Sequence, residues 1–134
     1  NEVGALMDSG MDETSHRELL LHSADALSAL LSGLSSSGCP QIFVLEPFLF
    51  DTPQYLKSWM GTLEEVRGMI RQTVKKHPCR IHLLPTQPLL DDAVQRSGIQ
   101  EITKDGIHLA HEGHHVLAEM IVKSIWSIYD IQQS

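Results

Sequence analysis

Four of the eight histidines lie within the twelve-residue segment KDGIHLAHEGHH, residues 104–115. Two incompatible chemistries fit this segment. The first is hydrolysis by a serine mechanism. Asp105 stands three residues before His108, and Gly106 between them permits a turn. At this spacing the carboxylate can accept a hydrogen bond from Nδ1 of the imidazole. That bond would fix the tautomer and leave Nε2 free to deprotonate a nucleophile.

The second chemistry is zinc catalysis. His111, Glu112 and His115 match the pattern H-E-x-x-H. In that pattern two histidines one helical turn apart bind zinc, and the glutamate acts as general base. Gly113 would stand inside the helix, where it costs about 1 kcal/mol against alanine. The candidates for a third ligand that follow in the chain are Glu119 and Asp130. A zinc metallopeptidase is therefore kept as a distant third hypothesis.

Either chemistry needs a scaffold, and three apolar runs predict its strands. Residues 41–45 and 79–84 are short continuous runs of the kind found in strands covered on both faces. Residues 3–7 predict a further strand at the start of the chain. A helical pattern separates each pair of strands, and no Asn-Gly or Asp-Gly hairpin joins them. Strand–helix–strand order predicts parallel pairing, hence an α/β layered sheet in one domain over residues 1–134.

Helix signals fill the intervals. Ser15 and Glu18 form an S-x-x-E capping box, which predicts the start of a helix that continues to Leu34. Asp51-Thr52-Pro53 predicts the start of a second helix, which ends before Pro78. Residues 85–92, PTQPLLDD, predict a Pro-rich connection, and residues 91–96 a short exposed helical turn. The last helix is expected over residues 112–129.

Composition excludes several classes of protein. The formal net charge is −7, which argues against non-specific binding of nucleic acid because that needs a basic face. No apolar run approaches about 20 residues, so no membrane span is expected and the protein should be soluble. The sequence predicts no particular compartment.

A longer match gives the histidine segment more context. Residues 105–121, DGIHLAHEGHHVLAEMI, closely resemble the last motif of the SGNH, or GDSL-like, hydrolase family. In that motif an Asp-Gly-x-His pair precedes a Gly-His step and an amphipathic helix. QIFVLEP and CRIHLLP resemble the family's fourth and fifth strands. The resemblance implies a flavodoxin-like, three-layer α/β/α sandwich that hydrolyses carboxylic esters of small molecules, with no cofactor and no metal.

Within that resemblance, Asp105 would be the orienting acid and His108 the general base. The resemblance would also make the remaining charged and polar residues of the segment part of a helix's first turn, not metal ligands: His111, Glu112, His114 and His115.

The nucleophile motif departs from the family. Asp8-Ser9 could represent the Asp-Ser of the family's Gly-Asp-Ser, but Met7 stands in place of its glycine. The same stretch, Ser9 to Asp12, fits better as a degenerate third motif. In that alignment Met11 replaces an asparagine that donates to the oxyanion. The chain would then be the carboxyl-terminal portion of such a domain, truncated at its N-terminus.

Two expectations follow from that truncation. The nucleophilic serine would lie upstream of this chain, and the first strand would expose an edge that pairs with another segment or another copy. The alternative from a different class is a non-catalytic SGNH-like domain that keeps the scaffold for binding or assembly.

Overall fold

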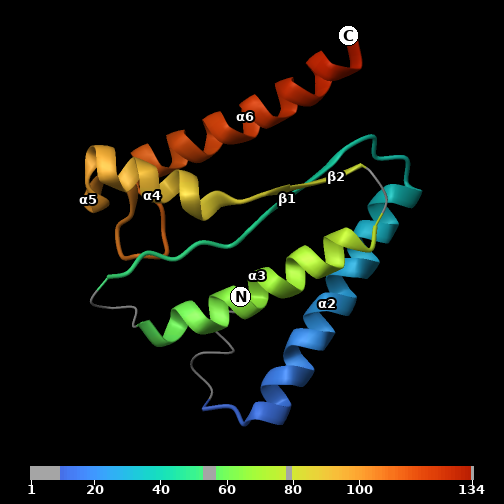
Figure 1. Ribbon diagram of the computed structural model, residues 1–134, viewed down its shortest axis with the longest axis horizontal. Coiled ribbons are helices and arrows are strands. Elements are labelled where there is room, and N and C mark those ends of the chain that lie inside the picture. The colour runs from blue at the N-terminus through green and yellow to red at the C-terminus, as the bar shows by residue number, and fades with distance from the viewer. Residues whose placement is uncertain (1–9, 53–56, 78–79, 134) are drawn as a thin grey trace. The chain divides into compact units, whose positions relative to one another are not determined.

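The computed structural model describes residues 10–52, 57–77 and 80–133. Figure 1 shows the order of the elements along the chain: α2 (Glu13–Ser36), β1 (Ile42–Leu45), α3 (Lys57–Lys75), β2 (Ile81–Leu84), α4 (Thr86–Ser97), α5 (Ile99–Ile102) and α6 (His111–Gln133). The fold is a mixed, helix-rich α/β arrangement with a small parallel sheet. Among the residues described, no helix is both long and apolar enough to cross a membrane.

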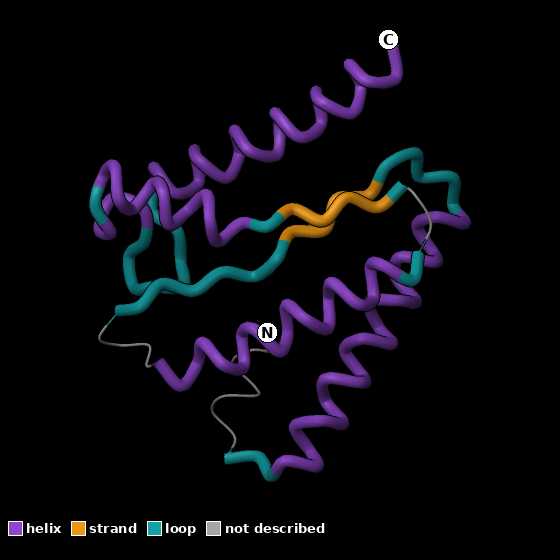
Figure 2. The backbone as a smooth tube through the Cα atoms, viewed as in Figure 1, coloured by secondary structure: helices purple, strands orange, loops and turns teal. Residues whose placement is uncertain are grey.

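The sheet confirms the prediction of parallel strands over 41–45 and 79–84. In Figure 2, β1 and β2 run side by side, with Ile42 opposite Ile81 and Leu45 opposite Leu84. The ladder continues past the last pair, because the Glu46 amide donates to the Leu84 carbonyl at 3.0 Å. The predicted strand over residues 3–7, and the edge it would expose, lie outside the described residues. Within those residues the sheet has two strands.

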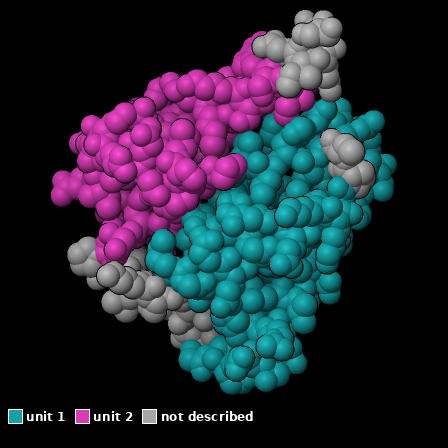
Figure 3. Space-filling view, in the orientation of Figure 1, with its two compact units in different colours: residues 1–47, 56–84 teal, residues 48–55, 85–134 magenta. Residues whose placement is uncertain are grey.

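The chain forms two compact units, coloured separately in Figure 3: residues 1–47 with 56–84, and residues 48–55 with 85–134. In the first unit, α2 packs against α3. One histidine contact joins these helices, and a second joins α2 to the chain just after α3. His16 Nε2 lies 2.6 Å from Glu65 Oε2, and Ser28 Oγ lies 3.0 Å from His77 Nε2. The single domain predicted over residues 1–134 stays a prediction.

The start of α2 differs from the prediction. The N-cap is Asp12, whose Oδ1 accepts hydrogen bonds from the amides of Thr14 at 2.9 Å and Ser15 at 3.0 Å. These bonds, the one from Ser15 first, lower the pKa of the Asp12 carboxyl. The predicted cap at Ser15 is wrong because the carboxylate three residues earlier satisfies two of the free amides of the first turn.

A charged network lies where β1 ends. The buried carboxylate of Glu46 accepts two hydrogen bonds from Arg71, at 2.6 and 2.8 Å. Nε of the buried Arg67 donates to the Pro47 carbonyl at 2.9 Å, and the same guanidinium pairs with Glu64. Both arginines come from α3, so they tie that helix to the chain that leaves β1.

In the second unit, α4 replaces the predicted Pro-rich connection. Leu90 and Ala93 of this helix are fully buried and belong to a core that also contains Phe50, Ile102 and Leu109. The prediction over residues 85–92 is wrong because Pro88 is only the third residue of the helix. Amides in the first turn have no partner within the helix, so a missing N–H costs little there.

Gly113 lets α6 approach α5 closely. A Cβ at this position would collide with the backbone carbonyl oxygen of Ile102 and lie 2.9 Å from Cδ2 of Leu109. The same carbonyl accepts a hydrogen bond from the Ala110 amide at 2.9 Å. The absence of a side chain at Gly113 is therefore what allows α6 to begin beside the end of α5.

Candidate functional site

The candidate site is the loop between α5 and α6. Its two ends are joined by an antiparallel bridge between Thr103 and Leu109. The Lys104 amide donates a hydrogen bond to the His108 carbonyl at 3.0 Å, which holds the two sides of the loop together one residue further in. Ile102 before the loop is fully buried and Leu109 at its end is 7% exposed. Both ends are thus anchored in the core of the second unit, while Lys104 and His108 between them are exposed.

The loop brings the predicted acid and base together. Oδ2 of Asp105 lies 2.6 Å from Nδ1 of His108. The other carboxylate oxygen, Oδ1, accepts hydrogen bonds from the amides of Ile107 at 2.9 Å and of His108 at 2.8 Å. Gly106 has φ +95°, a value that residues with a side chain rarely adopt. This glycine lets the chain turn sharply enough for the carboxylate to meet all three donors.

The hydrogen bonds fix the charge of the acid. Bonds from the His108 amide and imidazole, followed by the Ile107 amide, lower the pKa of Asp105 from 3.8 to about 2. The carboxylate is therefore ionised near neutral pH and can only accept hydrogen bonds. Nδ1 of His108 must then carry a proton, so in the neutral imidazole the lone pair is on Nε2.

The free face of the imidazole is open. The side chain of His108 is 74% exposed, and that of Asp105 is 32% exposed. In the described part of the chain, no residue forms a hydrogen bond with Nε2. Such an imidazole can take a proton from a hydroxyl brought to its outer side.

Residues 50–52, which are distant in the sequence, form hydrogen bonds with the backbone of the loop. The Phe50 amide donates to the Gly106 carbonyl at 3.0 Å, and Thr52 Oγ1 donates to the Asp105 carbonyl at 3.3 Å. Neither residue was predicted from the sequence, since both lie more than 50 positions before the loop and no spacing links them to it. A hollow of about 280 Å³ opens beside this contact; its walls come from Thr52, Ile99, Gln100, Thr103, Lys104, Asp105 and Gly106.

The zinc hypothesis requires three ligands in one place. His111 and His115 lie in the first turns of α6, and Nε2 of His115 is 3.3 Å from Oε1 of Glu119. Within residues 10–52, 57–77 and 80–133, no three side chains of histidine, cysteine, aspartate or glutamate form a group that could hold a metal ion. The side chain of Asp130 is outside the description.

The stretch expected to represent the nucleophile motif or the third motif, residues 7–12, is only partly described. Ser9, the alternative nucleophile, lies outside the described residues. Met11 comes directly before Asp12, the N-cap of α2. The alignment of this stretch with the family's third motif stays a prediction. Met11 offers a thioether, which cannot donate a hydrogen bond to an oxyanion.

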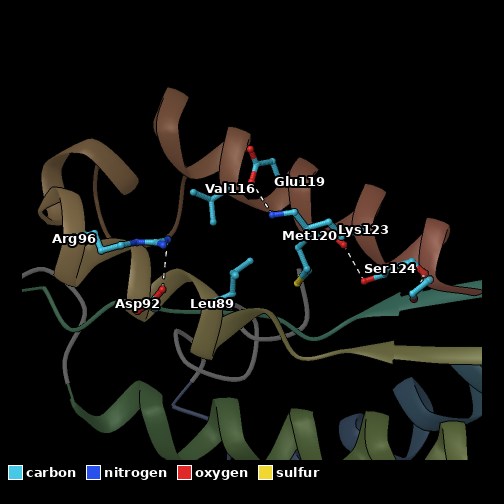
Figure 4. A pocket seen from close by; sticks show the side chains of 9 residues that line it. Leu89, Asp92, Arg96, Val116, Glu119, Met120, Lys123 and Ser124 are labelled. Carbon is cyan, nitrogen blue, oxygen red and sulfur yellow. Dashed lines mark hydrogen bonds and ion pairs between the residues drawn. The ribbon is translucent and has the colours of Figure 1, made fainter.

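A larger groove, of about 390 Å³, lies between α4 and α6 (Figure 4). Its charged side chains are paired with each other. Arg96 lies 3.4 Å from Asp92, and Lys123 lies 3.2 Å from Glu119, whose pKa Lys123 lowers. The groove does not include the acid or the base of the loop, and we assign it no function.

Comparison with known proteins supports the fold. The sequence matches no family model and no curated protein. Among solved structures, that of a candidate GDSL-like lipase from Parabacteroides merdae is similar to the structure of this chain, with a TM-score of 0.65 and 24% sequence identity. The match covers 75% of this chain and 47% of the lipase, so the chain spans about half the length of that protein. The chain thus has a GDSL-like fold.

Proposed function

We propose that this chain carries the acid and base of a serine-type hydrolase that acts on carboxylic esters. Asp105 orients His108, and His108 is the general base. The observation that carries the proposal is the 2.6 Å contact between Asp105 Oδ2 and His108 Nδ1 in a loop that leaves Nε2 exposed. In the complete protein the scaffold would be the three-layer α/β/α sandwich typical of GDSL-like hydrolases.

The chemistry follows from the tautomer. Nε2 of His108 removes the proton from a serine hydroxyl while the oxygen attacks the ester carbonyl. The imidazolium that forms is stabilised by the Asp105 carboxylate, and it returns the proton to the leaving alcohol as the acyl-enzyme forms. In the second half of the reaction, His108 deprotonates a water molecule, whose oxygen attacks the acyl carbonyl. The bond between the acyl group and the serine oxygen then breaks, the serine takes the proton back from His108, and the carboxylic acid is released.

The serine itself comes from outside the described residues. We propose that it belongs to a strand preceding this chain in a longer protein, because the chain spans about half of the lipase it resembles in structure. Ser9 is the other possible source. If the first strand of this chain exposes an edge, we expect it to pair either with the preceding strand of the longer protein or with a second copy of the chain. A protein that is strictly monomeric in sedimentation analysis would argue against the second copy.

Covalent labelling tests the mechanism. A fluorophosphonate probe should label one serine of the longest available form of the protein, and the same form should hydrolyse p-nitrophenyl acetate. His108→Ala should abolish labelling, because the serine then has no base. His114→Ala is the matched control, since this exposed histidine of α6 should have no role. Labelling that persists in His108→Ala contradicts the proposal, and loss in Ser9→Ala identifies that residue as the nucleophile.

A non-catalytic binding or assembly domain is the second candidate. It is supported by Met11, which cannot donate to an oxyanion, and by the lack of a described hydroxyl beside Nε2 of His108. Absence of labelling in the longest form would favour it. The zinc hypothesis has a separate test: one equivalent of bound zinc, together with loss of activity on chelation, would overturn both the hydrolase mechanism and the binding domain.

A further inference from the structure

Thr103 places its hydroxyl inside the loop that carries the acid and the base. The residue is 4% exposed. Its Oγ1 accepts a hydrogen bond from the Gly106 amide at 2.9 Å and donates one to the His108 carbonyl, also at 2.9 Å. One oxygen thus contacts the residue directly after the acid and the residue that is the base.

The two groups bonded to the Thr103 hydroxyl differ in whether they keep another partner when the hydroxyl is removed. The His108 carbonyl also accepts from the Lys104 amide at 3.0 Å, so it keeps a partner if the hydroxyl is removed. The Gly106 amide has no second acceptor among the described residues, and Gly106 is buried. Loss of the hydroxyl would leave this amide without a partner, which costs more than the bond itself contributes.

The position of Gly106 decides where the carboxylate points. Gly106 directly follows Asp105 and has a positive φ. A shift of its amide would rotate the peptide that joins the two residues. The amides of Ile107 and His108, which hold Oδ1 of Asp105, follow in the same turn. We propose that Thr103 is a positioning residue, whose hydroxyl holds this turn so that Asp105 and His108 stay aligned. Its effect on catalysis rests on the function proposed above, but its effect on geometry does not.

Three variants separate this role from general stability. Thr103→Val keeps the shape of the side chain and removes the hydroxyl, and Thr103→Ser restores the hydroxyl. Thr73→Val is the matched control. Thr73 is equally buried, and its hydroxyl donates to the Met69 carbonyl at 2.9 Å within α3. Circular dichroism verifies that each variant is folded.

The main measurement is the titration of the Asp105 carboxyl by carbon NMR. The pKa of Asp105, about 2 in the native loop, should rise toward 3.8 in Thr103→Val and remain low in Thr103→Ser and Thr73→Val. In the form of the protein that hydrolyses esters, Thr103→Val should lower kcat by about 10²-fold with KM unchanged, as expected for a misplaced catalytic group.

The outcomes are distinguishable. If Thr103→Val leaves the Asp105 titration unchanged, the positioning role is wrong whatever the activity. If the titration shifts as expected but the wild-type protein hydrolyses no ester, the positioning role stands and the proposed function fails. Should Thr103→Val not fold, hydrogen exchange of the wild-type Gly106 amide decides: slow exchange supports the bond to Thr103, and exchange as fast as in an open loop overturns it.

Discussion

Replacing Gly113 by alanine should destabilise the protein, although alanine is the better helix former. The added Cβ would collide with the Ile102 carbonyl oxygen, which is backbone and cannot turn aside. Overpacking of this kind costs about 1–3 kcal/mol. Displacing the carbonyl also weakens its hydrogen bond with the Ala110 amide, a loss of about 1 kcal/mol. The gain in helix propensity is about 1 kcal/mol and offsets only that last loss.

The net loss is therefore about 1–3 kcal/mol in the free energy of unfolding, which for a chain of this length lowers the melting temperature by roughly 4–12 °C. Thermal and urea unfolding, followed by circular dichroism, measure it. Gly61→Ala is the matched control, because a Cβ at Gly61 in α3 would have nothing within 4 Å. That variant should be stabilised by up to about 1 kcal/mol. A Gly113→Ala protein as stable as wild type would refute the close approach of α6 to α5.

Three further predictions concern charged groups. Asp105→Asn should reduce ester hydrolysis by about 10⁴-fold, because the amide can donate to Nδ1 of His108 and so favour the wrong tautomer; the rate with p-nitrophenyl acetate measures this, and a rate near wild type would contradict it. The Asp105 pKa is lowered in the folded state, from 3.8 to about 2, so its contribution to stability is present above about pH 3.8 and lost as the pH falls through about 2. The difference in unfolding free energy between wild type and Asp105→Asn should thus shrink across that range, and a constant difference would disprove the linkage. Arg71→Ala should clearly lower the urea concentration at the midpoint of unfolding, because the substitution removes two hydrogen bonds that Arg71 donates to the buried carboxylate of Glu46. Arg17→Ala, which removes an exposed pair, should leave the midpoint nearly unchanged.

The sequence predicted the parts of the fold that depend on local pattern. The apolar runs at 41–45 and 79–84 predicted parallel strands correctly because a short continuous apolar run is a clear local signal, although only Ile42 and Leu84 of the two strands are buried. The start of α2 was misplaced by three residues, since both Asp12 and Ser15 are good caps and only the structure shows which side chain reaches the amides. In residues 85–97, two prolines outweighed the helical spacing of Leu90, Ala93 and Val94, although that spacing was visible in the sequence.

The candidate site divides in the same way. Asp105 and His108 are three residues apart, so their contact depends on one turn and could be predicted from spacing and a glycine. Phe50 and Thr52 could not be found, because their contact with the loop requires the chain to return from a distant position. Thr103 was close enough to be noticed, but a threonine two residues before an aspartate is too common to single out. Local geometry was thus predictable, and the bracing of that geometry was not.

The hydrogen bonds that orient the carboxylate of Asp105 and the imidazole of His108 come from residues 103–108, and two further bonds, from Phe50 and Thr52, hold the backbone of the same loop. A unit this short can be transplanted. Any scaffold that offers two buried anchors in place of Ile102 and Leu109, at the same separation, together with donors in place of the Phe50 amide and the Thr52 hydroxyl, should hold the acid and base in the same relation. In protein engineering, this loop is therefore a graft that could bring a preorganised base to a serine on an unrelated framework, without importing the sheet.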